Sequence, residues 1–267
     1  MRRGQLARAE DCFRQALTLV EQCNGLMGKV LFSPCLALLL AERGDISQAQ
    51  SILHSTLLLA RRLHLVPYIG YVLITLGTLR LIQATLLDES SDAHSGIDDE
   101  TSISLLKKAK RTIEHALSFE GIDAEIHLEG CLILLEVNWL LDGNEILYEQ
   151  VVSLRTRSEQ RGLTWLLPRI ERLLGTILAA RDNQEQASLH FEQSLQHARN
   201  YDLRREYAHT LHSYGKVLLK QPAEANHTKS REYLQEAQQV FTSCHSVHDL
   251  RKVEKLLASS SSFIKIS

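Results

Sequence analysis

Small and large residues recur along the chain at spacings of three and four, the period that places side chains on one face of an α-helix. The clearest stretch follows a Gly44-Asp45 turn and carries Ala49, Leu53 and Leu57. The same spacing starts at three other alanines: Ala9, Ala109 and Ala187. A large residue four positions later, such as Phe191, fills the space beside the small one. The pattern therefore predicts a recurring helix that a neighbouring helix approaches closely at its small residue.

A second helical pattern lies upstream of these helices and carries a small residue of its own. That residue is Gly77, Gly175 or Gly215. Glycine within a helix costs roughly 1 kcal/mol relative to alanine, so its recurrence at this point predicts close contact with another helix. The repeating unit is therefore predicted to be a pair of antiparallel helices, helix A followed by helix B.

The paired pattern resembles the tetratricopeptide repeat, which has Leu-Gly in helix A, a Gly-Asp type turn, and a small and a large residue in helix B. The position of the small residue in helix B falls at Ala9, Ala49, Ala109, Leu147, Ala187 and Ser230, which gives intervals of 40, 60, 38, 40 and 43 residues. Leu147 departs from the pattern, because a small residue is expected there. These units are longer than the roughly 34 residues of the standard repeat. The resemblance implies an all-α fold, a right-handed α-solenoid of about six tetratricopeptide-like helix pairs in a single domain over residues 1–258.

Three segments depart from the regular spacing. The 60-residue interval contains a surplus in residues 87–102, an acidic, Ser-rich stretch predicted to be a flexible insertion. The chain opens on a helix B, since Gly4 already occupies the turn position, and this predicts that further sequence precedes it. Residues 247–258 are amphipathic and predict a capping helix, followed by a tail over residues 259–267.

Composition narrows the classes of partner. The chain has 30 Lys and Arg against 32 Asp and Glu, a net charge of −2 that disfavours direct binding to nucleic acid or to an anionic membrane. Its longest uncharged stretch, residues 65–79, is shorter than the roughly 20 residues of a membrane span. No signal sequence is visible, so a cytoplasmic location is expected. Five cysteines without a CxxC pair favour reduced thiols over disulfides or structural zinc.

The sequence lacks the common motifs of catalytic and cofactor-binding sites. The sequence contains no phosphate-binding loop, GxSxG elbow or HExxH motif, so we expect no enzyme activity and no cofactor. Two histidine pairs have a spacing that metal ligands use: His209 with His212, and His245 with His248. A third ligand of matching geometry is not evident, so no metal site is predicted. RNA binding by a helical repeat remains an alternative, although the side chains at equivalent positions do not recur in type.

The resemblance also points to a binding surface. In a tetratricopeptide superhelix, helix A lines the concave face, where extended peptides or partner helices bind. Counting from the glycine of helix A gives these candidate residues: Tyr71, Arg169, Arg172, Thr176, His209, His212 and Lys216. The early part of this face is apolar and the later part is cationic, which favours carboxylates or phosphates. The alternative is a solvated face whose cations are balanced by Glu171 and Glu206.

The long units and the ends of the helices suggest a more specific relationship. Ala60-Arg61-Arg62, Ala198-Arg199 and the closing segment 249–254 are similar to the C-terminal repeat sensor of bacterial STAND-type regulators, which are signal-transducing ATPases. The resemblance implies a noncatalytic module that binds a protein segment or a small effector and regulates upstream domains of the same polypeptide or complex, often in transcriptional regulation. A freestanding tetratricopeptide adaptor or assembly scaffold is the alternative.

Overall fold

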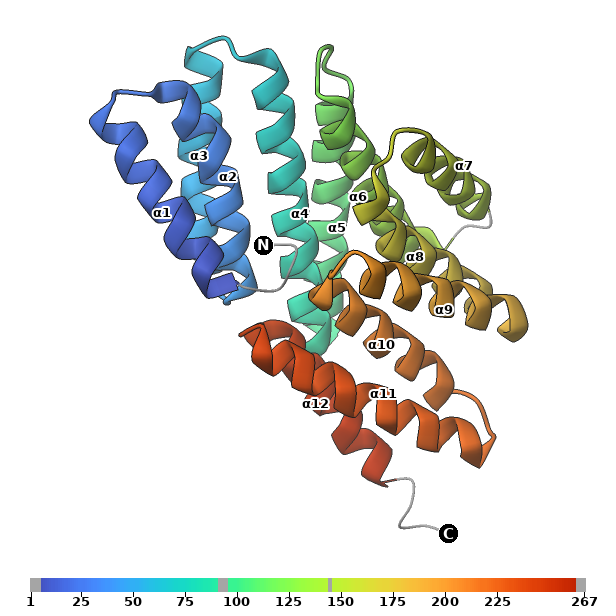
Figure 1. The fold of residues 1–267 in the computed structure, drawn as a ribbon. Coiled ribbons are helices and arrows are strands. Elements are labelled where there is room, and N and C mark those ends of the chain that lie inside the picture. The colour runs from blue at the N-terminus through green and yellow to red at the C-terminus, as the bar shows by residue number, and fades with distance from the viewer. Residues whose placement is uncertain (1–5, 91–95, 144–145, 263–267) are drawn as a thin grey trace. The chain divides into compact units, whose positions relative to one another are not determined.

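The computed structural model describes residues 6–90, 96–143 and 146–262, and within these ranges the chain forms helices and no strand. The side chains of residues 88–90, 96–99 and 259–262 are outside this description. The helices are α1 (Leu6–Gln22), α2 (Leu26–Glu42), α3 (Ile46–Arg62), α4 (Val66–Ser90), α5 (Gly96–Leu117), α6 (Ala124–Asp142), α7 (Leu147–Gln160), the short 3-10 helix η1 (Thr164–Leu166), α8 (Leu167–Ala180), α9 (Gln184–Asn200), α10 (Arg204–Leu219), α11 (Glu224–Ser243) and α12 (Val247–Ser262) (Figure 1). The predicted all-α class is confirmed.

The chain divides into an N-terminal unit, residues 6–147, and a C-terminal unit, residues 148–262 of the described part. In the N-terminal unit each helix from α1 to α6 packs against the next, and α4 with α5 forms the most extensive contact. Its core is built from fully buried residues such as Leu53, Leu79 and Ile113. This order of neighbours is the one expected of stacked helix pairs.

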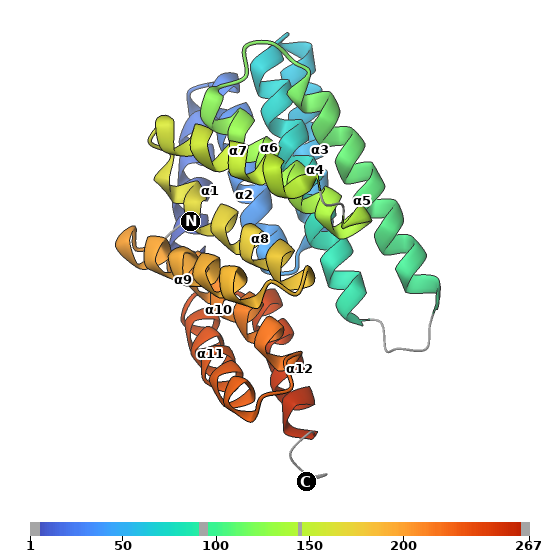
Figure 2. The same ribbon diagram turned by 90° about the vertical axis from the view of Figure 1, so that its right-hand side faces the viewer.

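The C-terminal unit repeats the arrangement with shorter helices. The pairs α8 with α9 and α10 with α11 pack side by side (Figures 1 and 2). Helix α10 also contacts α8 and α12, so the three form one layer, which we call the α8–α10–α12 layer. Leu211, Leu234 and Phe241 are fully buried where α10 and α11 meet the closing helix. Helices α8 and α10 carry the glycines of the predicted helix A, and α12 covers the segment predicted to be a capping helix.

The glycines of helix A lie where the sequence places the closest helix contacts. A Cβ at Gly175 would lie 3.1 Å from the carbonyl oxygen of Ala187 and 3.1 Å from the ring of Phe191. The equivalent contacts elsewhere are Gly77 against Ala109 and Ile113, and Gly215 against Ser230 and Leu234. Ala49 is fully buried in the same role, whereas Ala9 on the first helix is only half-buried. In three helix pairs the glycine of the first helix therefore lies directly against the second helix.

The turns between paired helices also follow the predicted Gly-Asp type. Gly44 has a φ of +91°, and Asp182 at the equivalent point has a φ of +56°, in the left-handed region. The next residue caps the following helix, since Asp45 accepts a hydrogen bond from the backbone N–H of Gln48. Asn183 caps Gln186 in the same way. The turn thus sets the angle at which helix B folds back on helix A.

Helices reach into both ends of the acidic segment 87–102, since α4 continues to Ser90 and α5 begins at Gly96. Ser102 is buried and donates a hydrogen bond of 3.0 Å to the carbonyl oxygen of Ala84, which ties the two helices together. Residues 91–95 of this segment lie outside the described residues. The closing helix begins at Val247 as predicted but extends to Ser262, beyond the predicted end at 258, and residues 263–267 of the predicted tail lie outside the description.

Helix α4 is the one stretch in the described part of the chain with the length and hydropathy of a membrane span, over Val66–Leu87. Its most apolar part is 61% buried within the fold. Leu73, Leu76 and Leu79 belong to the N-terminal core. The burial accounts for the apolar composition of α4, because a core helix in contact with neighbours on several sides is apolar around most of its circumference.

Candidate functional site

Charged and imidazole side chains gather on the α8–α10–α12 layer. Helix α10 presents Arg205, His209, His212 and Lys216 at spacings of four, three and four, which places them on one face. Asp249 of α12 meets this face. Its Oδ2 lies 3.1 Å from Nη2 of Arg205 and 3.5 Å from Nε2 of His209. The layer therefore joins α10 to α12 through a carboxylate that is only 4% exposed.

A second ion pair joins α10 to α8. Nη1 of Arg172 donates to Oε2 of Glu206 at 2.7 Å. The side chains are 14% and 28% exposed, so this pair is shielded from solvent more than an ordinary surface pair. Thr176, one turn along α8, donates to the carbonyl oxygen of Arg172 at 2.8 Å. Arg172 is thus held in place from its own helix and from the neighbouring one.

The two carboxylates of the layer remain ionised despite their burial. Burial raises the pKa of Glu206, but the positive charges of Arg172 and Arg169 outweigh it and bring this pKa down to about 2. For Asp249, burial again acts to raise the pKa, while His209, Arg205 and a hydrogen bond from Ser246 hold it well below its ordinary value. The carboxylates therefore carry full negative charge at neutral pH.

The histidines of the layer are uncharged at neutral pH, in contrast to the carboxylates, because their pKa values are also lowered. Burial lowers the pKa of His209 to about 3, although the nearby Asp249 raises it. Burial, together with the positive charges of Lys252 and Lys216, lowers the pKa of His212 to about 4. The pKa of His248 on α12 falls to about 4 for the same reasons, burial first and Lys252 second. All three imidazoles are therefore neutral at pH 7.

Most of the predicted binding residues belong to this layer. Arg172 and His209 lie within the network. His212 lies on the same face of α10, and Thr176 lies one turn beyond Arg172 on α8. Arg169 is half-buried and close enough to Glu206 to lower its pKa, while Lys216 is exposed at the end of the stripe. Tyr71 belongs to the N-terminal unit and lies 3.2 Å from Sγ of Cys35. The structure thus brings six of the seven residues together in one unit.

The predicted neutralisation by two glutamates is half correct. Glu206 pairs with Arg172, whereas Glu171 is buried and contacts Nδ1 of His190 at 2.6 Å. Arg155 is the other partner of Glu171, at 3.4 Å. Glu171 therefore neutralises charge between α7, α8 and α9. This leaves the α8–α10–α12 layer with more cations than a count of both glutamates suggests.

The sequence interpretation missed the contribution of α12. It treated the amphipathic closing helix only as a cap. Asp249 of this helix pairs with Arg205 of α10, and the charge of Lys252 lowers the pKa of His212. His248 is 5% exposed, and neither ring nitrogen has a hydrogen-bond partner. The signal available in the sequence was Asp249 and Lys252, an acidic and a basic residue three positions apart on a short amphipathic helix.

The histidine pairs do not form metal sites in the part of the chain that the structure describes. No group of three or more His, Cys, Asp or Glu side chains there is arranged to hold a metal ion. His245 precedes α12, with a φ of +56° in the turn, so it does not share a helix face with His248. His209 is directed to Asp249 instead.

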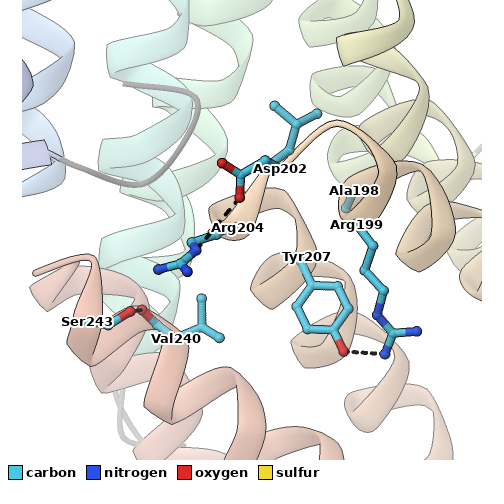
Figure 3. A pocket seen from close by; sticks show the side chains of 8 residues that line it. Ala198, Arg199, Asp202, Arg204, Tyr207, Val240 and Ser243 are labelled. Atoms are coloured by element: carbon cyan, nitrogen blue, oxygen red, sulfur yellow. Dashed lines mark hydrogen bonds and ion pairs between the residues drawn. The ribbon is translucent and has the colours of Figure 1, made fainter.

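A separate pocket of about 420 Å³ opens where the α9–α10 turn meets the end of α11 (Figure 3). Arg199 lies over the ring of Tyr207, 4.9 Å from its centroid, and donates to the phenolic oxygen at 2.6 Å. Tyr207 donates in turn to Glu236 at 2.8 Å. Arg204 on the rim pairs loosely with Asp202 at 3.8 Å. Arg199 is thus hydrogen-bonded to Tyr207. The contacts from Arg199 through Tyr207 to Glu236 connect α9, α10 and α11.

Replacing Tyr207 with phenylalanine should reduce the stability of the C-terminal unit by about 1 to 2 kcal/mol, because the variant loses the hydrogen bonds to Arg199 and Glu236 but keeps the ring. Urea unfolding followed by fluorescence would measure this. Replacing the exposed Tyr201 with phenylalanine is the matched control and should change stability by less than about 0.5 kcal/mol. Equal changes in the free energy of unfolding of the two variants would show that the hydrogen bonds of the Tyr207 hydroxyl do not stabilise the unit.

Comparison with known proteins gives no assignment. No family model matches the chain, and no curated protein matches it.

Proposed function

We propose that the chain is a noncatalytic helical-repeat module that binds an acidic segment of a partner protein on its α8–α10–α12 layer. The single observation that supports this most is the row of cations on the layer, in which Lys216 is exposed on the helix that also carries Arg205, next to Arg172 of α8. Cations gathered on one surface attract anionic partners and determine their register.

The ion pairs inside the layer also support a preorganised surface. Arg172 is fixed by Glu206, and Arg205 is fixed by Asp249, so their guanidinium groups need little further ordering when a ligand arrives. Lys216 is exposed and can reach solvent or a partner directly. A partner carboxylate would thus meet fixed positive charges with one adjustable cation beside them.

The resemblance to STAND-type sensors supports a cellular setting for this binding. In this proposal the chain is the cytoplasmic regulatory part of a signal-transducing ATPase or transcriptional regulator. Occupation of the layer would change how α12 packs on α10, because Asp249 holds the two helices together. A bound ligand can shift such an equilibrium only by its difference in affinity for the two states.

The test is selection of displayed peptides on the whole chain, followed by binding measurements with Lys216→Glu. Selected peptides should be rich in Asp and Glu, and the substitution should weaken their binding roughly tenfold, the effect of losing about one good ion pair. Arg161→Glu, at an exposed position after α7, changes the charge equally and should leave affinity within about twofold. Selection of peptides without acidic residues, or equal losses for both variants, would contradict the proposal.

Lys216 is a better position for this test than Arg172. Arg172→Glu would place a second carboxylate beside Glu206, whose Oε2 lies 2.7 Å from the present guanidinium. Like charges at this distance would disrupt the packing of α8 on α10, and loss of binding would then report loss of the fold. Lys216→Glu changes an exposed side chain.

A further inference from the structure

The pocket at the α9–α10 turn is separate from the α8–α10–α12 layer, because none of the residues that line it belongs to the charge network of that layer. Its volume of about 420 Å³ lies within the range of roughly 300 to 1,000 Å³ in which small-molecule sites are found. Its walls come from α9, α10, α11 and the turn between the first two. The pocket therefore has the size of a binding site for a small molecule, and it lies within one unit.

The inner wall of the pocket is apolar. It is formed by Ala198, Leu203 and the ring of Tyr207, which are all buried, and Val240 of α11 completes it. An apolar group that packs against this wall is removed from water, and this burial favours binding. The wall therefore favours a ligand with an apolar body.

Hydrogen bonds between the same three helices hold this wall in its shape. Arg199 donates to the phenolic oxygen of Tyr207 at 2.6 Å, and Tyr207 donates to Glu236 of α11 at 2.8 Å. Figure 3 shows Arg199 on one side of the Tyr207 ring and Arg204 on the other. The wall thus exists before a ligand arrives, and a preformed wall lowers the entropic cost of binding.

The positive charge at the mouth of the pocket comes from Arg204. Its Nε lies 3.8 Å from Oδ1 of Asp202, which is longer than a hydrogen bond. The two side chains are 66% and 60% exposed, and ion pairs between such exposed groups contribute little to stability. Arg204 forms no hydrogen bond to another residue in the described part of the chain. A carboxylate on a ligand therefore competes with only a weak contact for this guanidinium group.

The charges that line the pocket favour a ligand with one negative charge. Among the lining residues are two cations, Arg199 and Arg204, and one anion, Asp202. Arg199 is already hydrogen-bonded to the phenol of Tyr207, so Arg204 is the cation that a ligand meets at the mouth. A carboxylate offers two coplanar oxygens that match the fork of one guanidinium group. A phosphate dianion would bring a second negative charge beside Asp202.

We propose that this pocket binds a small-molecule monocarboxylate with an apolar body. The carboxylate pairs with the guanidinium group of Arg204, and the body packs against Leu203, Val240 and the ring of Tyr207. The inference does not rest on the proposed function, because the pocket and the layer share no residue. The next residue, Arg205, belongs to the layer, so the ligand lies close to the peptide surface without being part of it.

The test is titration of the whole chain, followed by NMR, with three carboxylates of different shape: phenylbutyrate, hexanoate and indoleacetate. The primary amide of each acid is the uncharged counterpart of nearly the same shape. At least one acid should bind saturably, and about tenfold more tightly than its amide, the effect of about one charge-assisted pair. No saturable binding of any of the three acids, or equal binding of acids and amides, would overturn the inference.

Arg204→Met tests the role of the charge, because methionine keeps an apolar stem and removes the guanidinium group. The acids should bind about tenfold more weakly to this variant, and the amides should bind as they do to the wild type. Arg161→Met removes a cation at an exposed position of the same unit, and affinity for the acids should stay within about twofold. Acid binding that is unchanged in Arg204→Met, or that falls equally in both variants, would contradict the assignment.

Ser243→Phe tests the location of the site. Ser243 lines the pocket but is exposed, so a phenylalanine ring can occupy the mouth without entering the core. This variant should weaken the binding of acids and amides alike by at least about tenfold. Thr242→Phe adds the same ring at the neighbouring exposed position, which does not line the pocket, and should bind like the wild type. Both variants should keep the circular dichroism spectrum of the wild type. Acid binding that survives Ser243→Phe would place the ligand elsewhere and overturn the inference.

The two proposals fail separately. Acidic peptides that depend on Lys216, combined with no binding of the three acids, would overturn the carboxylate pocket and leave the proposed function standing. Acid binding that depends on Arg204 and Ser243, combined with no selected acidic peptide, would overturn the proposed function and leave the pocket.

Discussion

Gly77→Val is expected to reduce the stability of the N-terminal unit by about 3 kcal/mol or more. Even a Cβ at Gly77 would collide with the side chain of Ile113, which is fully buried at the centre of the α4–α5 contact. Overpacking of a core typically costs about 1 to 3 kcal/mol, and a β-branched side chain set against both Ile113 and the backbone of α5 lies at or beyond the upper end. Separation of α4 from α5 would expose the largest helix contact of this unit.

The two tryptophans allow this unit to be measured by itself. Trp139 lies on α6 in the N-terminal unit, and Trp165 lies on η1 in the C-terminal unit. In a Trp165→Phe background, urea unfolding followed by tryptophan fluorescence reports the N-terminal unit through Trp139. Gly77→Val should lower the unfolding midpoint in this background.

Two further variants separate collision from helix propensity. Ser51→Val places valine at an exposed position within α3 of the same unit and should cost less than about 1 kcal/mol. Ile113→Ala alone should cost about 2 to 5 kcal/mol, but together with Gly77→Val it should cost clearly less than the sum, since valine fills the space that Ile113 leaves. Additive losses would show that residues 77 and 113 are not in contact.

The helix pairs and their register could be predicted because they depend on local spacing. In these helix pairs a glycine in helix A lies against a small residue in helix B, as Gly175 lies against Ala187. Side chains three and four apart share a face in any α-helix, so the pattern does not depend on distant parts of the chain. Such contacts can therefore be recognised in the amino-acid sequence alone.

The segment 87–102 could not be predicted in the same way. Its acidic and Ser-rich composition is typical of a loop, but Ser102 is buried against Ala84, and Leu106 follows one turn later in the core. Packing of a few side chains on one face stabilises a helix whose remaining residues are polar. Tertiary contact therefore accounts for the helix at the C-terminal end of this segment.

The charge network of the candidate site depends on contacts over long distances in sequence. Arg205 and Asp249 are 44 residues apart, and Arg172 and Glu206 are 34 apart. The stripe on α10 was predictable from its spacing, but the identity of its partners was not, because that required the orientation of α12. His248 had no signal of its own, since a histidine without partners has the same sequence pattern as a satisfied one.

Lowering the pH from 7 to 5 is expected to remove roughly 3 to 5 kcal/mol from the stability of the C-terminal unit. The pKa of His209 is about 3 and those of His212 and His248 are about 4 in the folded state, against about 6.5 for an ordinary histidine. The unfolded chain therefore binds protons first as the pH falls through about 6.5, and each histidine costs roughly 1 kcal/mol per pH unit until its folded pKa is reached. Below about pH 4 the carboxyl groups of Asp249 and Glu206 add to the loss of stability. Their pKa values are lowered in the folded state, so the unfolded chain takes up protons on these groups before the folded chain does.

The measurement is urea unfolding at pH 7, 6 and 5 in a Trp139→Phe background, where Trp165 reports the C-terminal unit. The variant His248→Phe should lose about a third of the pH dependence, since it removes one of three titrating groups, and it should be more stable than the wild type at every pH because it buries no unpartnered nitrogen. A stability that is the same at pH 7 and 5 would mean that the histidines are as accessible to protons in the fold as in the unfolded chain, and the account of a buried, cation-rich layer would then be wrong.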